Sequence, residues 1–496
     1  MKNYKQQTST YNFDALGRVT TINNPDGTVE STTYTWDSSI GLYRVTQNAT
    51  GQAQIRTYYD ALNRELRKGQ QRFNGSWQYV DTQYDDFGRV KRVSLPYKST
   101  ASYWAINSYD DYDRITKVEE PLGKSMTTSY SGNSVTVVQN GISTTHTYDK
   151  RGLLATVSDP AGTITYEYRP DKQLNKVTAP GNIVTSFDYD NYGRRTKIID
   201  PSAGTKTFGY DTAGNVSEET DANGKIVRMI YDTYDRLIQR EYVGELTTDY
   251  TYNSDGLLIL EKSNNGTEKK YTYDEFSRLL IEKEALDTEK QNLVKTYSYE
   301  NGNISEIGYS SEMNSASTAI GYESYIYTYG TLSEIRWKGN TSIWKLTGED
   351  ERGLPTSSAT GGLNRSYNYD INGNPTKRIV KYGNNTLQDF SYGFSTANGN
   401  LLWRKDNTRN KQEDFEYDNL NRLISFGGKR VGYDNKGNIT QLSGIGTLEY
   451  NSSRPYAVSN VLPAMNCRIP STPQTVTYNG MMRPKSIKHN DYSAEL

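Results

Sequence analysis

The feature that most constrains this chain is a short signature that recurs along it. The signature reads aromatic, Asp or Asn, two free residues, a turn residue and then usually Arg or Asn. FDYDNYGR at 187–194 and FGYDTAGN at 208–215 are two copies, and from Tyr168 to Tyr273 the step is 21 residues every time. A fixed period of this length is typical of repeat architectures, in which each unit buries its face against its neighbours.

The signature covers most of the chain. Its clear copies begin at Phe13, Tyr59, Tyr84, Tyr109, Tyr148, Tyr189, Tyr210, Tyr231, Tyr252, Tyr273, Tyr369, Tyr417 and Tyr433. The pattern is less regular in 300–368, where we expect irregular repeats. We therefore predict one repeat region at 1–450, followed at 451–496 by last repeats that lead toward a C-terminal core not visible in the sequence.

Each copy has the chemistry of a strand that enters a tight turn. Aromatic residues two apart, such as Phe187 and Tyr189, lie on one face of a strand. The following Asp can accept a backbone N–H at the first turn position. The fourth turn position is expected to have φ > 0, which favours Gly. Where Gly is absent, the replacements are Asn63, Asp113, Asp235, Ser277 and Asn421.

A second strand and a second turn complete the unit. Two strands of about six residues and two turns fill the 21-residue period. Apolar residues after the turn lie three apart, as in Val90 and Val93, which strict alternation would place on opposite faces. We therefore predict a β-bulge just after the turn. We also expect Tyr210→Ala to cost about 3–5 kcal/mol if that ring is fully buried.

Composition favours a thin sheet and excludes several classes of protein. Apolar residues make up 34% of the chain, and its 43 tyrosines outnumber 10 phenylalanines and 6 tryptophans. Tyrosine suits a sheet with one dry and one wet face. The formal net charge of −1 gives no basis for nucleic acid or an anionic membrane as a partner. No signal-peptide apolar region and no apolar stretch of about 20 residues is visible.

In its signature and period, the chain resembles the YD-repeat family of Rhs proteins, teneurins and the BC components of Tc toxins. The resemblance runs from about Phe13 to Asn438, and YNSSRPYAVSNV at 450–461 is similar to a segment near the end of such arrays. It implies an all-β fold: an antiparallel β-hairpin ribbon spiralling into an open or partial hollow shell. In the Rhs and Tc branches that shell encloses a C-terminal toxin, which a terminal core releases by aspartyl self-cleavage.

The sequence departs from the complete family pattern. The core carries Asp-Pro-x-Gly followed shortly by Gly-x-Asn-x-Tyr. Asp159-Pro160-Ala161-Gly162 matches the first half only and lies within the array, so we interpret it as a turn. We expect the chain to be part of a longer protein whose core and toxin domain lie elsewhere.

No residues form a convincing catalytic, cofactor or metal site. His146 occupies an aromatic slot and is expected to be a wall residue, while His489 lies in a polar tail. Cys467 is the single cysteine and has no local His, so an inert thiol is expected. Asp111-x-Asp113 lacks the other oxygen ligands of a calcium loop. We predict no enzyme activity, no cofactor and no metal.

The arginines of the signature have two interpretations. They can pair with neighbouring Asp or stack on Tyr rings along the wall, or they can form a ladder that binds sugars or anions. These residues are Arg18, Arg64, Arg89, Arg114, Arg194, Arg236, Arg278 and Arg422.

The function that we expect is structural. The chain would form a shell segment of an Rhs-type protein that encapsulates a C-terminal toxin and helps to deliver it in intercellular competition or host attack. The full-length protein would then be secreted or lie at the cell surface. The alternative is an exported binding module for cell-surface glycans or proteins, and a glycoside hydrolase is the least favoured. Membrane insertion is not expected.

Overall fold

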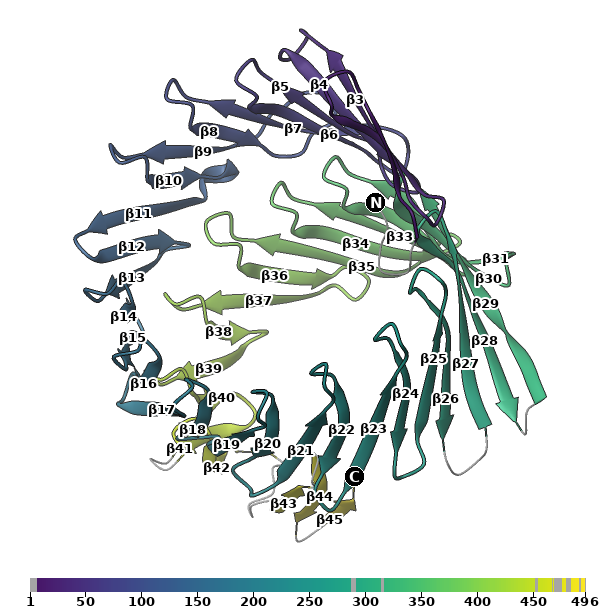
Figure 1. Cartoon of the computed structure of the whole chain (residues 1–496). Coiled ribbons are helices and arrows are strands. Elements are labelled where there is room, and N and C mark those ends of the chain that lie inside the picture. The colour runs from purple at the N-terminus through teal and green to yellow at the C-terminus, as the bar shows by residue number, and fades with distance from the viewer. Residues whose placement is uncertain are drawn as a thin grey trace. The chain divides into compact units, whose positions relative to one another are not determined.

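The fold consists of strands that follow one another as hairpins (Figure 1). The structure is a computed structural model that describes residues 7–286, 291–313, 316–450, 454–465, 467, 475–478, 483–489 and 492–495. Within these residues, β1–β42 belong to a 42-stranded sheet, and β43–β45 form a 3-stranded sheet. The one helical element described is a single 3-residue 3-10 turn, η1 (Pro121–Gly123). The predicted all-β, antiparallel class is confirmed, and the sheet is open.

The strands have the following bounds. The first run is β1 (Thr10–Phe13), β2 (Val19–Asn23), β3 (Val29–Trp36), β4 (Tyr43–Ala49), β5 (Ile55–Tyr59), β6 (Glu65–Gln71), β7 (Trp77–Tyr84), β8 (Val90–Ser94), β9 (Trp104–Tyr109), β10 (Ile115–Glu119) and β11 (Ser125–Ser131). The next is β12 (Ser134–Gln139), β13 (Ile142–Tyr148), β14 (Leu154–Asp159), β15 (Gly162–Tyr168), β16 (Leu174–Ala179), β17 (Ile183–Tyr189), β18 (Arg195–Asp200), β19 (Gly204–Tyr210), β20 (Val216–Thr220), β21 (Ile226–Tyr231), β22 (Leu237–Tyr242), β23 (Leu246–Tyr252) and β24 (Leu258–Ser263).

The later strands continue the same series. They are β25 (Glu268–Tyr273), β26 (Leu279–Leu286), β27 (Gln291–Glu300), β28 (Asn303–Met313), β29 (Ala316–Thr328), β30 (Thr331–Trp337), β31 (Thr341–Glu349), β32 (Pro355–Thr360), β33 (Leu363–Tyr369), β34 (Pro375–Tyr382), β35 (Asn385–Phe394) and β36 (Leu401–Asp406). The last are β37 (Lys411–Tyr417), β38 (Leu423–Phe426), β39 (Lys429–Tyr433), β40 (Ile439–Leu442), β41 (Gly446–Tyr450), β42 (Val458–Pro463), β43 (Thr475–Tyr478), β44 (Pro484–His489) and β45 (Tyr492–Glu495).

Two kinds of turn alternate along the ribbon. Turns that follow odd-numbered strands are called signature turns below, and most of them carry the Tyr-Asp sequence or a close variant, as at 190–194. Turns that follow even-numbered strands, as at 201–203, are called return turns. Because consecutive strands are antiparallel, the signature turns lie along one edge of the ribbon and the return turns along the other.

The signature turn has the predicted backbone. In the 190–194 copy, Gly193 N donates to Asp190 O at 3.1 Å, and Asp190 N donates to Arg194 O at 2.9 Å. Gly193 has φ +81°. The five residues that replace Gly also have positive φ, between 58° and 68°: Asn63, Asp113, Asp235, Ser277 and Asn421. The turn prediction is confirmed at each of these positions.

The predicted β-bulge is also present. Between β17 and β18, Asp188 pairs with Lys197 while Tyr189 pairs with Arg195, so one extra residue stands on the strand after the turn. Between β7 and β8, Tyr84 opposes Val90 and Thr82 opposes Val93. Since Thr82 and Tyr84 share a face, the bulge returns the two valines to that same face. This explains the apolar spacing of three.

The sheet is thin, as the composition predicts. The accessible surface is 29,714 Å² for 56.2 kDa. A compact protein of this mass is expected to expose about 18,500 Å² of accessible surface. Two separate globular domains of half the mass would together expose about 22,000 Å². No large side chain among the described residues is less than 2% exposed. Stability must therefore come from contacts between neighbouring strands and turns and not from a deep core.

The chain divides into two compact units that each contain an early stretch of the ribbon and a later part in two pieces. Unit 1 holds residues 1–127, 271–284 and 290–412, and unit 2 holds 128–270, 285–289 and 413–496. In each unit, the first range is called the first pass, and the two later ranges together are called the second pass. The domain boundary predicted near residue 450 stays a prediction.

The positive φ of the signature turn can be tested at Gly152. Its φ is +78°, and a Cβ built there meets no atom within 4 Å, so Gly152→Ala isolates backbone strain. We expect the turn at 149–153 to open more easily by about 1–2 kcal/mol, the cost of an L-residue in the left-handed region. Hydrogen exchange of the amides of β13 and β14 measures this. Gly209→Ala is the control, because Gly209 has no positive φ and a Cβ built there meets Glu218 Cβ at an ordinary 3.4 Å. Equal effects of the two substitutions would contradict the assignment of backbone strain to Gly152.

Candidate functional site

The Asp of each signature turn binds its own turn in two ways. In the 190–194 copy, Asp190 Oδ1 accepts from the backbone N–H of Tyr192 and of Arg194, both at 2.9 Å. Asp190 Oδ2 accepts from Arg194 Nε at 2.7 Å. One carboxylate therefore holds the turn backbone and the arginine side chain together. The same three bonds are made by Asp14, Asp60, Asp85, Asp110, Asp232, Asp274 and Asp418.

The arginine reaches the next unit of the ribbon. Arg194 lies over the ring of Tyr210, the following signature tyrosine, at 4.5 Å, and over Tyr192 of its own turn at 5.0 Å. A guanidinium already fixed by Asp190 is thus also placed between two rings. The same double contact is made by Arg89, Arg236 and Arg278. Both structural roles proposed for the arginines, ion pairing and ring stacking, are confirmed.

The signature tyrosine contributes through its hydroxyl as well as its ring. Tyr210 OH donates to the backbone carbonyl of Arg195 at 2.6 Å. Arg195 is the first residue after the preceding signature turn, at the bulge. A bulge disrupts the ladder locally, so a carbonyl there gains from an outside donor. The equivalent bond is made by Tyr84, Tyr109, Tyr189, Tyr252, Tyr299, Tyr369, Tyr433 and Tyr450.

The electrostatics of the turn follow from these contacts. The guanidinium of Arg236 hydrogen-bonds Asp232 and lowers the pKa of that carboxyl; desolvation opposes the shift, and the backbone N–H groups of Arg236 and Tyr234 add to it. The pKa is also lowered at Asp14, Asp60, Asp85, Asp110, Asp149, Asp190, Asp211, Asp274, Asp350 and Asp418. These carboxylates are therefore held in the ionised form, which suits turn stabilisation and not general acid catalysis.

In each unit, the two passes meet along a seam. Signature turns of the second pass contact return turns of the first pass. In unit 1, Asn303 Nδ2 donates to Gly51 O at 3.2 Å, and Arg72 pairs with Glu349 at 3.1 Å. In unit 2, Asn421 Nδ2 donates to Asn140 O at 3.4 Å. The partners of these three contacts are 252, 277 and 281 residues apart.

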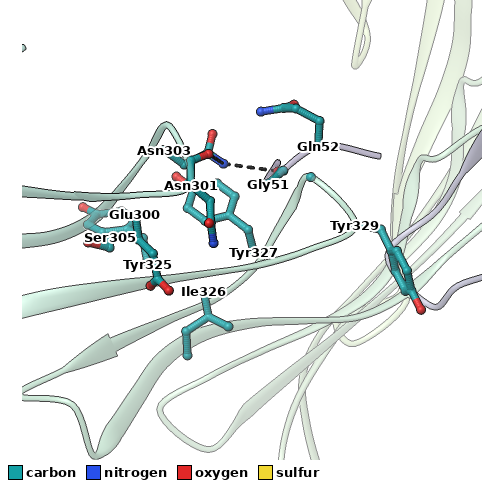
Figure 2. A pocket seen from close by; sticks show the side chains of 11 residues that line it. Gly51, Gln52, Glu300, Asn301, Asn303, Ser305, Tyr325, Ile326, Tyr327 and Tyr329 are labelled. Atoms are coloured by element: carbon teal, nitrogen blue, oxygen red, sulfur yellow. Dashed lines mark hydrogen bonds between the residues drawn. The ribbon is translucent and has the colours of Figure 1, made fainter. Parts of the chain in front are cut away.

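The seam of unit 1 contains an open cavity of about 410 Å³ (Figure 2). Backbone and side chains of the return turn at Gly51 and Gln52 form one side. The other sides come from the β27–β28 turn and from β29. Polar lining residues are Glu300, Asn301, Asn303 and Ser305, and the rings are those of Tyr325, Tyr327 and Tyr329. The cavity combines amides, a carboxylate and aromatic rings without a concentrated charge.

The residues considered for chemistry in the sequence do not converge. His146 lies in β13, opposite Val135 and Val157, as a partly exposed residue of the sheet. Asp113 is a turn residue that accepts from Arg89 at 2.6 Å. Cys467 is a free, partly exposed thiol. His489 belongs to β44, and its side chain lies outside the described ones.

Asp159-Pro160-Ala161-Gly162 is a turn, as predicted. Asp159 ends β14 and pairs with Gly162 at the start of β15. Its Oδ1 accepts from Ala161 N at 2.8 Å. Within the described ranges, no three His, Cys, Asp or Glu residues are grouped so that they could hold a metal ion. No helix in the described part of the chain is long and apolar enough to span a membrane.

Sequence reasoning missed two features: an apolar preference within the signature and the seam contacts. Every copy that ends in Arg carries an apolar residue at its third turn position: Leu16, Leu62, Phe87, Tyr112, Tyr192, Tyr234, Phe276 and Leu420. This pairing is visible in the sequence and reflects the contact between ring and guanidinium where the residue is aromatic. The seam contacts have no such signal, because their partners are far apart in the chain.

The cost of about 3–5 kcal/mol for Tyr210→Ala was expected only for a fully buried ring, and this condition is not met. Tyr210 is only partly buried, because a one-layer sheet cannot enclose its ring. We therefore expect Tyr210→Ala to cost less than the about 3–5 kcal/mol of a fully buried aromatic. Tyr210→Phe removes only the bond to Arg195 O and should cost about 0.5–1.5 kcal/mol. Denaturant unfolding measures the stability of both variants, and Tyr192→Phe is the control because Tyr192 is 85% exposed. A Tyr210→Phe variant as stable as the unchanged chain would refute the stabilising role of the hydroxyl.

The lowered pKa of the turn carboxylates predicts acid sensitivity. A carboxyl whose pKa is lower in the folded chain stabilises the fold above its unfolded pKa, and this contribution is lost as pH falls through the folded pKa. We expect this contribution to be constant from pH 7 to about 5 and to fall below about pH 4. Denaturant midpoints at several pH values measure it. Asp232→Asn should reduce the loss of stability at low pH that comes from its own repeat, because Asn does not titrate. An Asn can still hold the turn backbone, since Asn253 forms the same backbone bonds without an ion pair.

Comparison with known proteins gives partial family matches. The family model of the teneurin YD-shell matches residues 106–220, and that of the RHS repeat matches 210–247. No curated protein matches the chain.

Solved structures match nearly the whole fold. A crystal structure of TcdB2-TccC3-TEV has a TM-score of 0.72 at 15% identity and covers 95% of this chain and 30% of its own. The structure of TcdB2-TccC3 without its hypervariable C-terminal region has a TM-score of 0.73 at 14% identity, and the match covers 94% of this chain and 30% of that one. The structure of a Photorhabdus luminescens Tc holotoxin pore has a TM-score of 0.54 at 13% identity, and the match covers 94% of this chain and 29% of that one. The chain spans about 30% of the length of these structures. The resemblance of its repeats to the YD-repeat family of Rhs proteins, teneurins and Tc toxins is confirmed.

Proposed function

We propose that this chain forms part of the wall of an Rhs-type shell that encloses a toxin polypeptide. The cargo would be a C-terminal segment of the complete protein, delivered to competing or host cells. The complete protein would act outside the producing cell. The observation that carries the proposal is the seam, where signature turns of one pass close against return turns of an earlier pass.

The wall interpretation accounts for the chemistry of the repeat. A two-stranded unit is marginal in water, so each unit needs its neighbours. Asp190, Arg194 and Tyr210 join one unit to the next through an ion pair, a ring contact and a hydrogen bond. A sheet built in this way can extend without a core, which leaves space for cargo beside it. In this proposal the chain acts structurally and has no cleavage centre of its own.

The likeness to the Tc structures supports the proposal at the level of the fold. The structures of TcdB2-TccC3-TEV and of TcdB2-TccC3 without its hypervariable C-terminal region share this fold over most of the chain. At 14–15% identity the likeness concerns the fold alone. The toxin cargo, its delivery and the site of action therefore belong to the proposal.

A second candidate function is binding of cell-surface glycans. The seam cavity of unit 1 offers side-chain amides of Asn301 and Asn303 close to tyrosine rings, a combination that suits sugar hydroxyls and sugar faces. Glycan-array binding that is lost in Asn301→Ala would favour it. Absence of glycan binding by the intact chain would remove it.

Protease protection tests the shell. In the product of the complete gene, we expect the segment C-terminal to this chain to resist protease until denaturant opens the shell. Mass spectrometry of the fragments over time measures this. Digestion of that segment at the same rate in the native and the denatured protein would refute enclosure.

A seam variant sharpens the same experiment. Glu349→Ala leaves Arg72 without its partner at a place where the two side chains are only 6% and 16% exposed. Loss of one partner of a buried pair is costly, so we expect faster cleavage of the cargo. Glu218→Ala is the matched control, since it breaks an ion pair with Arg228 in which the side chains are 44% and 49% exposed.

A further inference from the structure

One face of the first pass of unit 1 differs in chemistry from the same face elsewhere in the ribbon. It is the sheet face opposite the signature tyrosines. In β13–β16 this face carries mostly threonine and serine, with one ion pair between Lys176 and Glu167 at 2.8 Å. In β4–β9 the strand register places four arginines and two tryptophans on it, called the arginine face below: Arg44, Arg56, Arg67, Arg92, Trp77 and Trp104.

Two of these arginines already hold a carboxylate. Arg67 binds Asp81 through two hydrogen bonds, from Nε to Oδ1 at 2.6 Å and from Nη2 to Oδ2 at 2.8 Å. The same guanidinium lies 5.3 Å from the ring centre of Tyr79. Arg44 pairs with Asp37 at 3.2 Å. The arginine face therefore binds a carboxylate beside an aromatic ring in the bidentate geometry that arginine favours.

The other two arginines have a ring beside them but no carboxylate. Arg56 lies over Trp77 at 4.0 Å, and Arg92 lies over Trp104 at 4.2 Å. Within the described part of the chain, neither arginine forms an ion pair: Arg56 Nε is buried without a hydrogen-bond acceptor, and Arg92 Nε donates to the neutral amide of Gln83 at 2.9 Å. Both arginines are partly exposed. Two positive charges on this face are therefore unmatched and lie within reach of a ligand.

The two unmatched arginines are spaced for an extended polypeptide. Arg56 belongs to β5 and Arg92 to β8, and the register offsets them by four residues along β7, from Tyr79 to Gln83. Three strand spacings and this offset separate them by about 20 Å on the sheet. Carboxylates about six residues apart in an extended segment span the same distance. β5 and β8 are each paired on both sides, so the arrangement does not depend on a free edge of the ribbon.

We propose that the arginine face binds an acidic segment of a partner polypeptide, with one carboxylate on Arg56 and another on Arg92. Each guanidinium then holds a carboxylate beside a tryptophan ring, as Arg67 holds Asp81 beside Tyr79. Tryptophan and arginine are also the side chains that contribute most to contacts between proteins. The inference does not depend on an enclosed toxin, so it can fail while the proposed function stands.

Fluorescence anisotropy of a labelled, glutamate-rich peptide of about ten residues tests this with the intact chain, since such a peptide covers the span between the two arginines. We expect Arg56→Gln and Arg92→Gln each to weaken binding by about tenfold, because each removes a charge-assisted contact. Arg56→Lys keeps the charge without the planar fork and should weaken binding by at least about threefold. Arg228→Gln is the matched control, because Arg228 lies on the same face of the ribbon in unit 2 and already pairs with Glu218 at 3.2 Å.

Two further measurements make the test decisive. A peptide with Gln in place of every Glu should not bind, and equal circular dichroism shows that each variant is folded. The product of the complete gene should bind the glutamate-rich peptide as this chain does; failure to bind there would mean that the same protein covers the face and would overturn the assignment to a partner. No binding by the intact chain up to about 1 mM peptide, binding that survives both Arg56→Gln and Arg92→Gln, or an equal loss in Arg228→Gln would also overturn the proposal.

Discussion

The structure depends on a series of contacts that joins each signature turn to the next unit of the ribbon. The series begins at the carboxylate of the turn and ends at the backbone of the strand that follows that turn. Asp190 fixes Arg194, Arg194 lies against Tyr210, and the Tyr210 hydroxyl caps the carbonyl of Arg195. The ring contact and the hydroxyl bond are each modest alone, at about 0.5–1.5 kcal/mol. Their value lies in repetition, because the tyrosine that completes one unit also begins the next. This explains why tyrosine, with a ring and a hydroxyl, is preferred to phenylalanine at the signature position.

The repeat could be predicted from sequence because its causes are local. Positive φ at Asn63 and Ser277 follows from their place four residues after the aromatic. The bulge follows from Val90 and Val93, whose spacing is compatible with one face only if a residue is added. The burial of Tyr210 could not be predicted, since the aromatic pattern shows which face a ring takes but not whether another layer covers it.

The seam could not be predicted, and the reason is physical. Arg72 and Glu349 are ordinary residues of a return turn and a strand end, and nothing near either one marks it for a partner 277 residues away. Their meeting depends on the way the two passes of unit 1 pack against each other. The cavity beside Asn303 likewise arises from three segments, and no segment contains a motif for it. A candidate site of this kind becomes visible only in three dimensions.

The sequence separation across the seam has a consequence for how the chain folds during synthesis. Hairpins form from neighbouring residues and can follow the chain as it leaves the ribosome. The contact between Gly51 and Asn303 must wait for 252 further residues, which at about 5–20 residues per second is a delay of about 10–50 s. During this interval the nascent ribbon is folded locally but still open along its return edge. In the proposed shell, a cargo that follows this chain in the sequence emerges only after Asn303. This part of the seam therefore has time to close before the cargo is made.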